Sequence, residues 1–254
     1  MRSAMTTLLA TLTLVYAGLC ATLFVFQRSL IYLPQTGMGG PAAPTLTLPV
    51  QGADLRVTFH ARQGQKALIY FGGNAEDVSH TLPELSAAFP EHALYLLNYR
   101  GFGGSSGRPS EAVLFADGLA LFDKVRETHR SIAVMGRSLG SAVAVYVASL
   151  RSADHLILVT PFDSLTDVAA RHYPFVPVRW LLLDRFESWK FAPLVKAPTL
   201  VIAAEHDEVV PRSSTKALAD RFQGGTTTLL TIPGAGHNTL SDCPEYMEIL
   251  KSVH

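Results

Sequence analysis

The sequence predicts an α/β protein built on a doubly wound, mostly parallel sheet. From Leu55 onward, short apolar runs alternate with helical patterns such as 111–128 and 213–222, as expected for parallel strands joined by crossover helices. Several apolar runs end in loops rich in glycine and polar residues, where such sheets bind ligands. With 254 residues, 48% hydrophobic and 17% charged, the chain can form one domain plus an apolar segment.

The apolar segment lies at the start of the chain. Residues 3–27 carry no charge, and this uncharged stretch is long enough to cross a bilayer. A buried core helix of the same length would normally show a polar face. We expect an uncleaved membrane anchor at 1–34, with a transmembrane helix at about 5–26, and a folded domain at 35–254. A cleaved signal peptide and a soluble helix are the alternatives.

The orientation of this single-pass anchor depends on few charges. Arg2 lies on one side and Arg28 on the other. We expect the N-terminus inside, which would place the folded domain in the periplasm or another extracytoplasmic space. A reporter fusion that finds the domain in the cytoplasm would refute this orientation.

The segment Gly136-Arg137-Ser138-Leu139-Gly140 connects an apolar strand at 132–135 to a small-residue helix at 142–150. Strand, Gly-x-Ser-x-Gly and helix form the nucleophile elbow of serine hydrolases. The strained turn needs glycines beside the serine because strand and helix pack closely there. A five-residue string also arises by chance in a chain with 19 glycines, so the candidate nucleophile Ser138 needs partners.

A base and an acid follow in the order that this type of sheet requires. The apolar run 200–204 leads to Asp207, the candidate acid, and the run 226–232 leads to a glycine-rich loop with His237, the candidate base. Three such residues at strand ends favour a catalytic triad. Other carboxylates compete for the role of the acid, with the first ranked second to Asp207: Asp163, Glu205 and Glu208.

The oxyanion of an acyl-transfer intermediate needs backbone N–H donors. Leu139, directly after the nucleophile, is one candidate donor. The strand 67–71 runs into Gly72-Gly73-Asn74-Ala75-Glu76-Asp77, where glycines permit close approach and the acidic pair suits the first turn of a helix. We expect Asn74, or Gly73 beside it, to supply the second donor.

Other features exclude alternative chemistry. The glycine cluster at 98–107 lacks the glycine that a dinucleotide fingerprint would need at Ser106, so we interpret it as a structural turn in which Arg100 ties neighbouring loops together. Basic and acidic residues balance at 21 each without a basic run, which argues against nucleic acid. Cys20 and Cys243 cannot form a zinc cluster, and we expect no metal or organic cofactor.

Between strands at 156–160 and 199–204 lies an insertion, at about 161–198, which we expect to form a short cap over the site. Pro174 and Pro177 break it into short pieces. Its aromatic residues either face an apolar acyl group or pack the cap onto the domain. They are Phe162, Tyr173, Phe175, Trp180, Phe186, Trp189 and Phe191.

Together, the motifs resemble the α/β-hydrolase superfamily, specifically its membrane-anchored abhydrolase-domain serine hydrolases. The resemblance covers nearly the whole chain through residues 26–34, 70–75, 98–103, 136–140, 207–211 and 234–238. It implies the α/β-hydrolase fold, a triad of Ser138, Asp207 and His237, and backbone donors at Asn74 and Leu139. Many relatives have histidine where this chain has Gly72.

The sequence therefore predicts a serine hydrolase that cleaves carboxylic ester or thioester bonds of small acyl or lipid-like substrates through an acyl-enzyme. The N-terminal helix makes the membrane a second expected partner, and the oligomeric state is left open. A serine peptidase remains an alternative because the elbow determines how a carbonyl is attacked and not what it is attached to. A non-catalytic binding protein that kept the fold is the more distant alternative.

Overall fold

The protein is built around one eight-stranded sheet. The computed structural model describes residues 2–35, 43–223 and 227–253. The strand order is β1-β2-β4-β3-β5-β6-β7-β8, and neighbours from β4 to β8 pair in parallel. The strands are β1 (Thr45–Val50), β2 (Ala53–His60), β3 (Lys66–Phe71), β4 (Ala93–Leu97), β5 (Ser131–Arg137), β6 (His155–Val159), β7 (Thr199–Ala204) and β8 (Thr227–Ile232). The predicted mostly parallel sheet is confirmed, and Thr226, where the last strand was expected to begin, lies outside the described residues.

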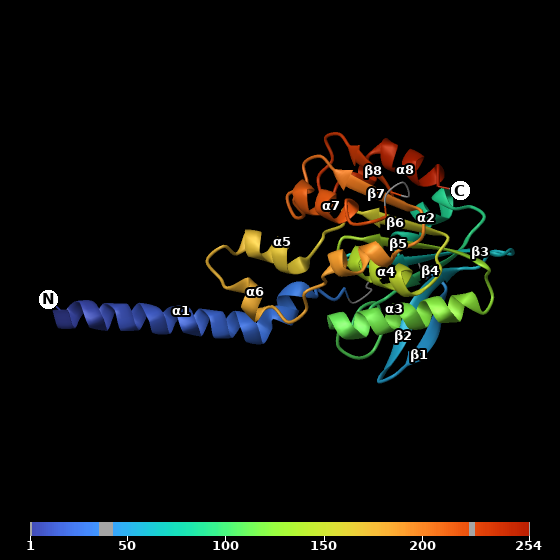
Figure 1. Cartoon of the computed structure of the whole chain (residues 1–254). Helices are drawn as coiled ribbons and strands as arrows, with labels where there is room; N and C mark the ends of the chain where they lie inside the picture. The colour runs from blue at the N-terminus through green and yellow to red at the C-terminus, as the bar shows by residue number, and fades with distance from the viewer. Residues whose placement is uncertain (1, 36–42, 224–226, 254) are drawn as a thin grey trace.

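Helices cover both faces of the sheet (Figure 1). Alternate residues of β3 point to opposite cores, with Ile69 and Phe71 in one and Leu68 and Tyr70 in the other. Helices α3 (Glu111–Arg126), α4 (Leu139–Leu150) and α7 (Arg212–Ala219) contribute to the first core, and α2 (Leu82–Ala88) and α8 (Pro244–Lys251) to the second. The doubly wound arrangement predicted from the alternating pattern is therefore confirmed.

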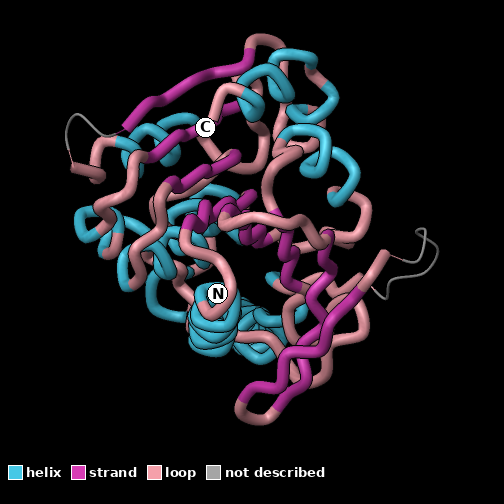
Figure 2. Tube along the Cα trace, turned by 90° about the vertical axis from the view of Figure 1, so that its right-hand side faces the viewer, coloured by secondary structure: helices cyan, strands magenta, loops and turns pink. Residues whose placement is uncertain are grey.

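The antiparallel edge of the sheet was not predicted. Strand β2 pairs antiparallel with both β1 and β4. The hairpin β1–β2 turns at Gly52, which has a φ of 77°, and it extends beyond the rest of the sheet in Figure 2. Arg100, interpreted as a link between loops, donates to the Asp117 carboxylate in α3 and to the Gln51 carbonyl in this hairpin turn.

Helix α1 (Arg2–Ile31) projects away from the sheet and carries the N-terminus at its far end (Figure 1). By length and composition it could cross a membrane, which is compatible with an anchor or a signal sequence. Its last turns meet the folded domain. Gln27 is buried there, and Tyr32, just after the helix, belongs to the first core.

The insertion between β6 and β7 contains α5 (Leu165–His172), α6 (Val178–Leu181) and the short 3-10 helices η1 (Ser188–Lys190) and η2 (Ala192–Leu194). A further 3-10 helix, η3 (Leu240–Asp242), precedes α8. The aromatic residues of this insertion fall into two groups. Phe186 and Phe191 pack edge-on against Phe115 of the first core, whereas Phe162 and Tyr173 line a cavity that also contains Ser138.

Candidate active site

The elbow between β5 and α4 has the strained geometry that its sequence motif demands. Ser138 has a φ of 49° and a ψ of −116°. Residues other than glycine rarely adopt these backbone angles. A Cβ on Gly136 would lie 2.3 Å from the Gly140 carbonyl oxygen, and one on Gly140 would lie 2.0 Å from the Phe71 carbonyl oxygen. Both glycines are therefore required by the close approach of α4 to β5 and β3.

The structure brings the three predicted triad side chains into one hydrogen-bonded chain. His237 Nε2 lies 3.0 Å from Ser138 Oγ, and its Nδ1 lies 2.9 and 3.0 Å from the carboxylate oxygens of Asp207. The Asp207 carboxylate also accepts the backbone N–H groups of Val209 and Val210. Because His237 is 5% exposed, water has little access to these contacts. The geometry suits transfer of a proton from the hydroxyl to the imidazole.

The competing carboxylates have other partners. Asp163 accepts a hydrogen bond from Ser214 Oγ on α7. Glu205 accepts a backbone N–H from the glycine-rich loop before His237, and Glu208 accepts the backbone N–H of His237 itself at 3.2 Å. These three carboxylates hold loops together through hydrogen bonds to backbone N–H groups and to the Ser214 hydroxyl, whereas the carboxylate of Asp207 is the one that meets the His237 ring.

One of the two candidate N–H donors in the loop after β3 is already engaged within the protein. The Gly73 N–H donates to Glu76 Oε2 at 2.8 Å, so that donor is engaged within the protein. The Asn74 side chain donates to the Ile31 carbonyl, and the Asn74 carbonyl accepts from the Leu33 N–H. These bonds leave the backbone N–H of Asn74 as the candidate donor. Leu139 is the first residue of α4, where the N–H has no partner within the helix.

Glu76 has a role that the sequence analysis missed. We expected it in the first turn of a helix, but that expectation is wrong because α2 begins only at Leu82. Its carboxylate instead accepts hydrogen bonds from Tyr70, Thr81 and the Gly73 N–H. Burial raises the pKa of Tyr70 well above its ordinary value, which keeps the hydroxyl protonated as a donor. Glu76 thus fastens the loop to β3.

We expect Glu76→Gln to lower the free energy of unfolding by about 1–3 kcal/mol, because an amide nitrogen would face donors that now converge on a carboxylate. The same change should lower kcat, since the loop with Asn74 would move. Urea denaturation and turnover measure the two effects. The matched control is Asp77→Asn, because the Asp77 carboxylate bonds mainly to Ser79. Unchanged stability in Glu76→Gln would contradict the fastening role.

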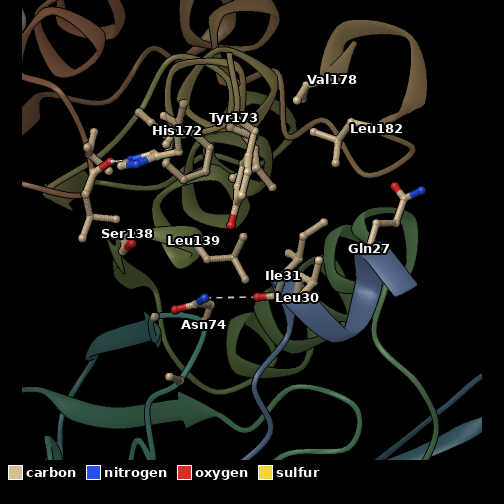
Figure 3. A pocket seen from close by; sticks show the side chains of 18 of the residues that line it. Gln27, Leu30, Ile31, Asn74, Ser138, Leu139, His172, Tyr173, Val178 and Leu182 are labelled. Carbon is tan, nitrogen blue, oxygen red and sulfur yellow. Dashed lines mark hydrogen bonds between the residues drawn. The ribbon is translucent and has the colours of Figure 1, made fainter. Parts of the chain in front are cut away.

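A cavity of about 860 Å³ opens beside Ser138. One wall comes from the end of α1 and the facing wall from the insertion between β6 and β7, as Figure 3 shows for Leu30 and Ile31 opposite Tyr173 and Leu182. Most of the lining is apolar, which suits a hydrocarbon chain. The part that α1 plays in the cavity was not predicted. Its lining residues there are Leu23, Phe24, Gln27, Leu30 and Ile31.

Comparisons with known proteins place the chain among proteins of the same fold. The family model for TAP-like proteins of the abhydrolase group matches residues 185–246. An uncharacterized protein of Mycobacterium tuberculosis (strain H37Rv) is 36% identical over 90% of this chain and 86% of its own length. The alpha/beta hydrolase domain-containing protein aho-3 of Caenorhabditis elegans is 32% identical over 73% of this chain and 56% of its own length. A solved esterase of Pyrococcus furiosus superposes with a TM-score of 0.68 at 17% identity, covering 86% of this chain and 96% of the esterase.

Proposed function

The chain belongs to the α/β-hydrolase superfamily, and on that premise we propose that it is a serine hydrolase of carboxylic esters or thioesters with acyl or lipid-like groups. The observation that carries the proposal is the hydrogen-bonded chain from Ser138 through His237 to Asp207. The largely apolar cavity beside it favours an acyl chain over a peptide.

The proposed reaction is acyl transfer to water. His237 Nε2 takes the proton of Ser138 as Oγ bonds to the substrate carbonyl carbon, and Asp207 stabilises the imidazolium. The N–H groups of Asn74 and Leu139 stabilise the oxyanion. His237 then protonates the leaving alcohol or thiol as its bond to the acyl carbon breaks. Water, deprotonated by His237, releases the acid and restores Ser138.

We also propose that α1 is an uncleaved membrane anchor over residues 1–34, joined to the hydrolase domain at 35–254 with its cap at about 161–198. Contacts at the end of the helix support this proposal. Gln27 bonds to the backbone of Leu181 and Leu183 in the cap, and Arg28 pairs with Asp184. Cleavage near Cys20 would release Tyr16, whose hydroxyl donates to the Phe175 carbonyl in the cap. The orientation with the domain outside the cytoplasm stays a prediction.

Covalent labelling tests the proposed function directly. A fluorophosphonate should react with the purified chain, and mass spectrometry of the digested product should find the modification on Ser138. A panel of a short p-nitrophenyl ester, an acyl thioester and a peptide should show turnover of the first two. Turnover of the peptide alone would favour the peptidase alternative. Absence of labelling together with absence of turnover would favour the non-catalytic one.

A further inference from the structure

The tip of the cap, residues 173–183, lies against the apolar helix α1. Tyr16, near the middle of α1, donates from its hydroxyl to the Phe175 carbonyl at 2.8 Å. Eleven residues further along α1, the Gln27 side chain bonds to the backbone of Leu181 and Leu183. Figure 1 shows the same arrangement, with the loop between α5 and α6 extending along α1 away from the sheet. The cap tip therefore accompanies the second half of α1.

The length of α1 decides where a bilayer would have to lie. Arg2 bounds the uncharged stretch of α1, and the part of that stretch before Tyr16, residues 3–15, is about 20 Å long at 1.5 Å per residue. A hydrocarbon core is about 30 Å thick and needs about 20 residues. A membrane that α1 crosses must therefore also surround turns of the helix that contact the cap tip. The tip then lies within the leaflet nearest the domain.

The composition of the cap tip fits that position. Phe175 is 87% exposed and Trp180 is 84% exposed, and neither lines the cavity. Arg179 is the one charged residue among 173–183, and it pairs with Asp167 on α5. Aromatic residues are enriched where membrane meets water, and a lone arginine can extend its charge toward the headgroups. Large apolar side chains such as Phe175 and Trp180 are unfavourable when exposed to water and favourable in a membrane leaflet.

The backbone of the cap tip is also suited to an apolar surrounding, where unpaired N–H groups are costly. Pro174 and Pro177 have no N–H group. The N–H group of Tyr173 donates to the Ala169 carbonyl of α5, and that of Leu183 to the Gln27 side chain. Five further N–H groups donate to carbonyls of the tip itself, those of Val176, Val178, Trp180, Leu181 and Leu182.

We infer that the cap tip is inserted beside α1 in the leaflet nearest the domain, and that the cavity admits an acyl ester that resides in that leaflet. The cavity supports this entry route because it runs from Ser138 to the junction of the two elements. Leu23 and Phe24 of α1 line it together with Tyr173 and Val176 of the tip. The inference about the substrate rests on the proposed function, whereas the inference about insertion does not.

The chain contains two tryptophans, Trp180 in the cap tip and Trp189 in η1, which makes insertion measurable by fluorescence. The full chain is reconstituted in phosphatidylcholine vesicles with and without brominated acyl chains, which quench tryptophan on contact. In Trp189→Phe, brominated lipid should remove about half of the emission, because Trp180 is then the reporter and lies in the leaflet. In the matched variant Trp180→Phe, the emission of Trp189 should hardly change. Quenching of neither, or of both to the same extent, would overturn the insertion.

Entry from the leaflet is tested with two esters, a short soluble p-nitrophenyl ester and a long-chain ester dissolved in the same vesicles. Replacing Phe175 and Trp180 together by serine should lower hydrolysis of the vesicle ester about tenfold, because the tip loses apolar area that holds it in the leaflet. Hydrolysis of the soluble ester should stay unchanged. An equal effect on both esters would overturn the entry route. If the wild-type chain hydrolyses neither ester, the proposed function fails, while tryptophan quenching still decides the insertion.

Discussion

Replacing Ser138 by alanine is expected to lower kcat for a short p-nitrophenyl ester by on the order of 10⁵ or more, as losses of nucleophilic serines do. The methyl group cannot bond to the carbonyl carbon, so no acyl-enzyme forms and the imidazole of His237 has no hydroxyl to deprotonate. Labelling by fluorophosphonate should disappear with the activity. KM should change little, because the apolar lining of the cavity is intact.

The matched control is Ser149→Ala on α4, the helix that directly follows Ser138. Its hydroxyl bonds only to the Tyr146 carbonyl of its own helix. This variant should keep the activity and the labelling of the wild type. Thermal unfolding of both variants shows that each is folded. Full activity in a folded Ser138→Ala protein would refute the nucleophile, whatever the other residues do.

Exchanging Asp207 for asparagine is expected to lower kcat by about 10⁴, the effect known when the acid of such a triad becomes an amide. The carboxylate accepts from His237 Nδ1, which leaves Nε2 free to accept the proton of Ser138. An amide nitrogen can donate to Nδ1 instead and so favour the tautomer with its proton on Nε2. That tautomer cannot act as a base toward the serine.

Asp163→Asn is the comparison that makes this prediction specific. Asp163 follows β6 and bonds to Ser214 on α7, so an amide there should affect stability more than turnover. We expect its kcat to stay within about threefold of the wild type, as for other polar changes away from the reacting atoms. Steady-state kinetics on both purified variants provide the measurement. Equal losses in the two variants would undo the assignment of the acid.

Much of the fold and the candidate site could be predicted because both depend on local patterns. Apolar runs such as those of β3, β5 and β6 form buried strands, and parallel strands end at the same edge of a sheet. Residues that follow β5, β7 and β8 therefore lie near each other although about a hundred positions separate Ser138 from His237. The strained elbow could also be predicted, since its two glycines leave room for helix and strand to approach.

Contacts between distant segments could not be predicted in this way. Glu76 looks like a residue of a helix start, but its carboxylate meets donors from Tyr70 and Thr81 that only the folded loop assembles. The partners of Asp163 and Asp207 likewise depend on where α7 and the last loop pack. The order of residues along the chain favours Asp207, but a local pattern does not show which of the two carboxylates meets the imidazole of His237.

The sequence by itself indicated the alternation of strands and helices after Leu55, the apolar N-terminal helix and the three residues proposed for catalysis. These features follow from hydrophobic periodicity and from turn chemistry, which act over a few neighbouring residues. Only the tertiary structure decided that α1 forms a wall of the cavity. It also decided that Phe175 and Trp180 are exposed on the cap tip, which lies against α1. The physical reason is that such contacts depend on the angle at which a helix leaves its domain and on long-range hydrogen bonds such as those of Gln27 and Asn74.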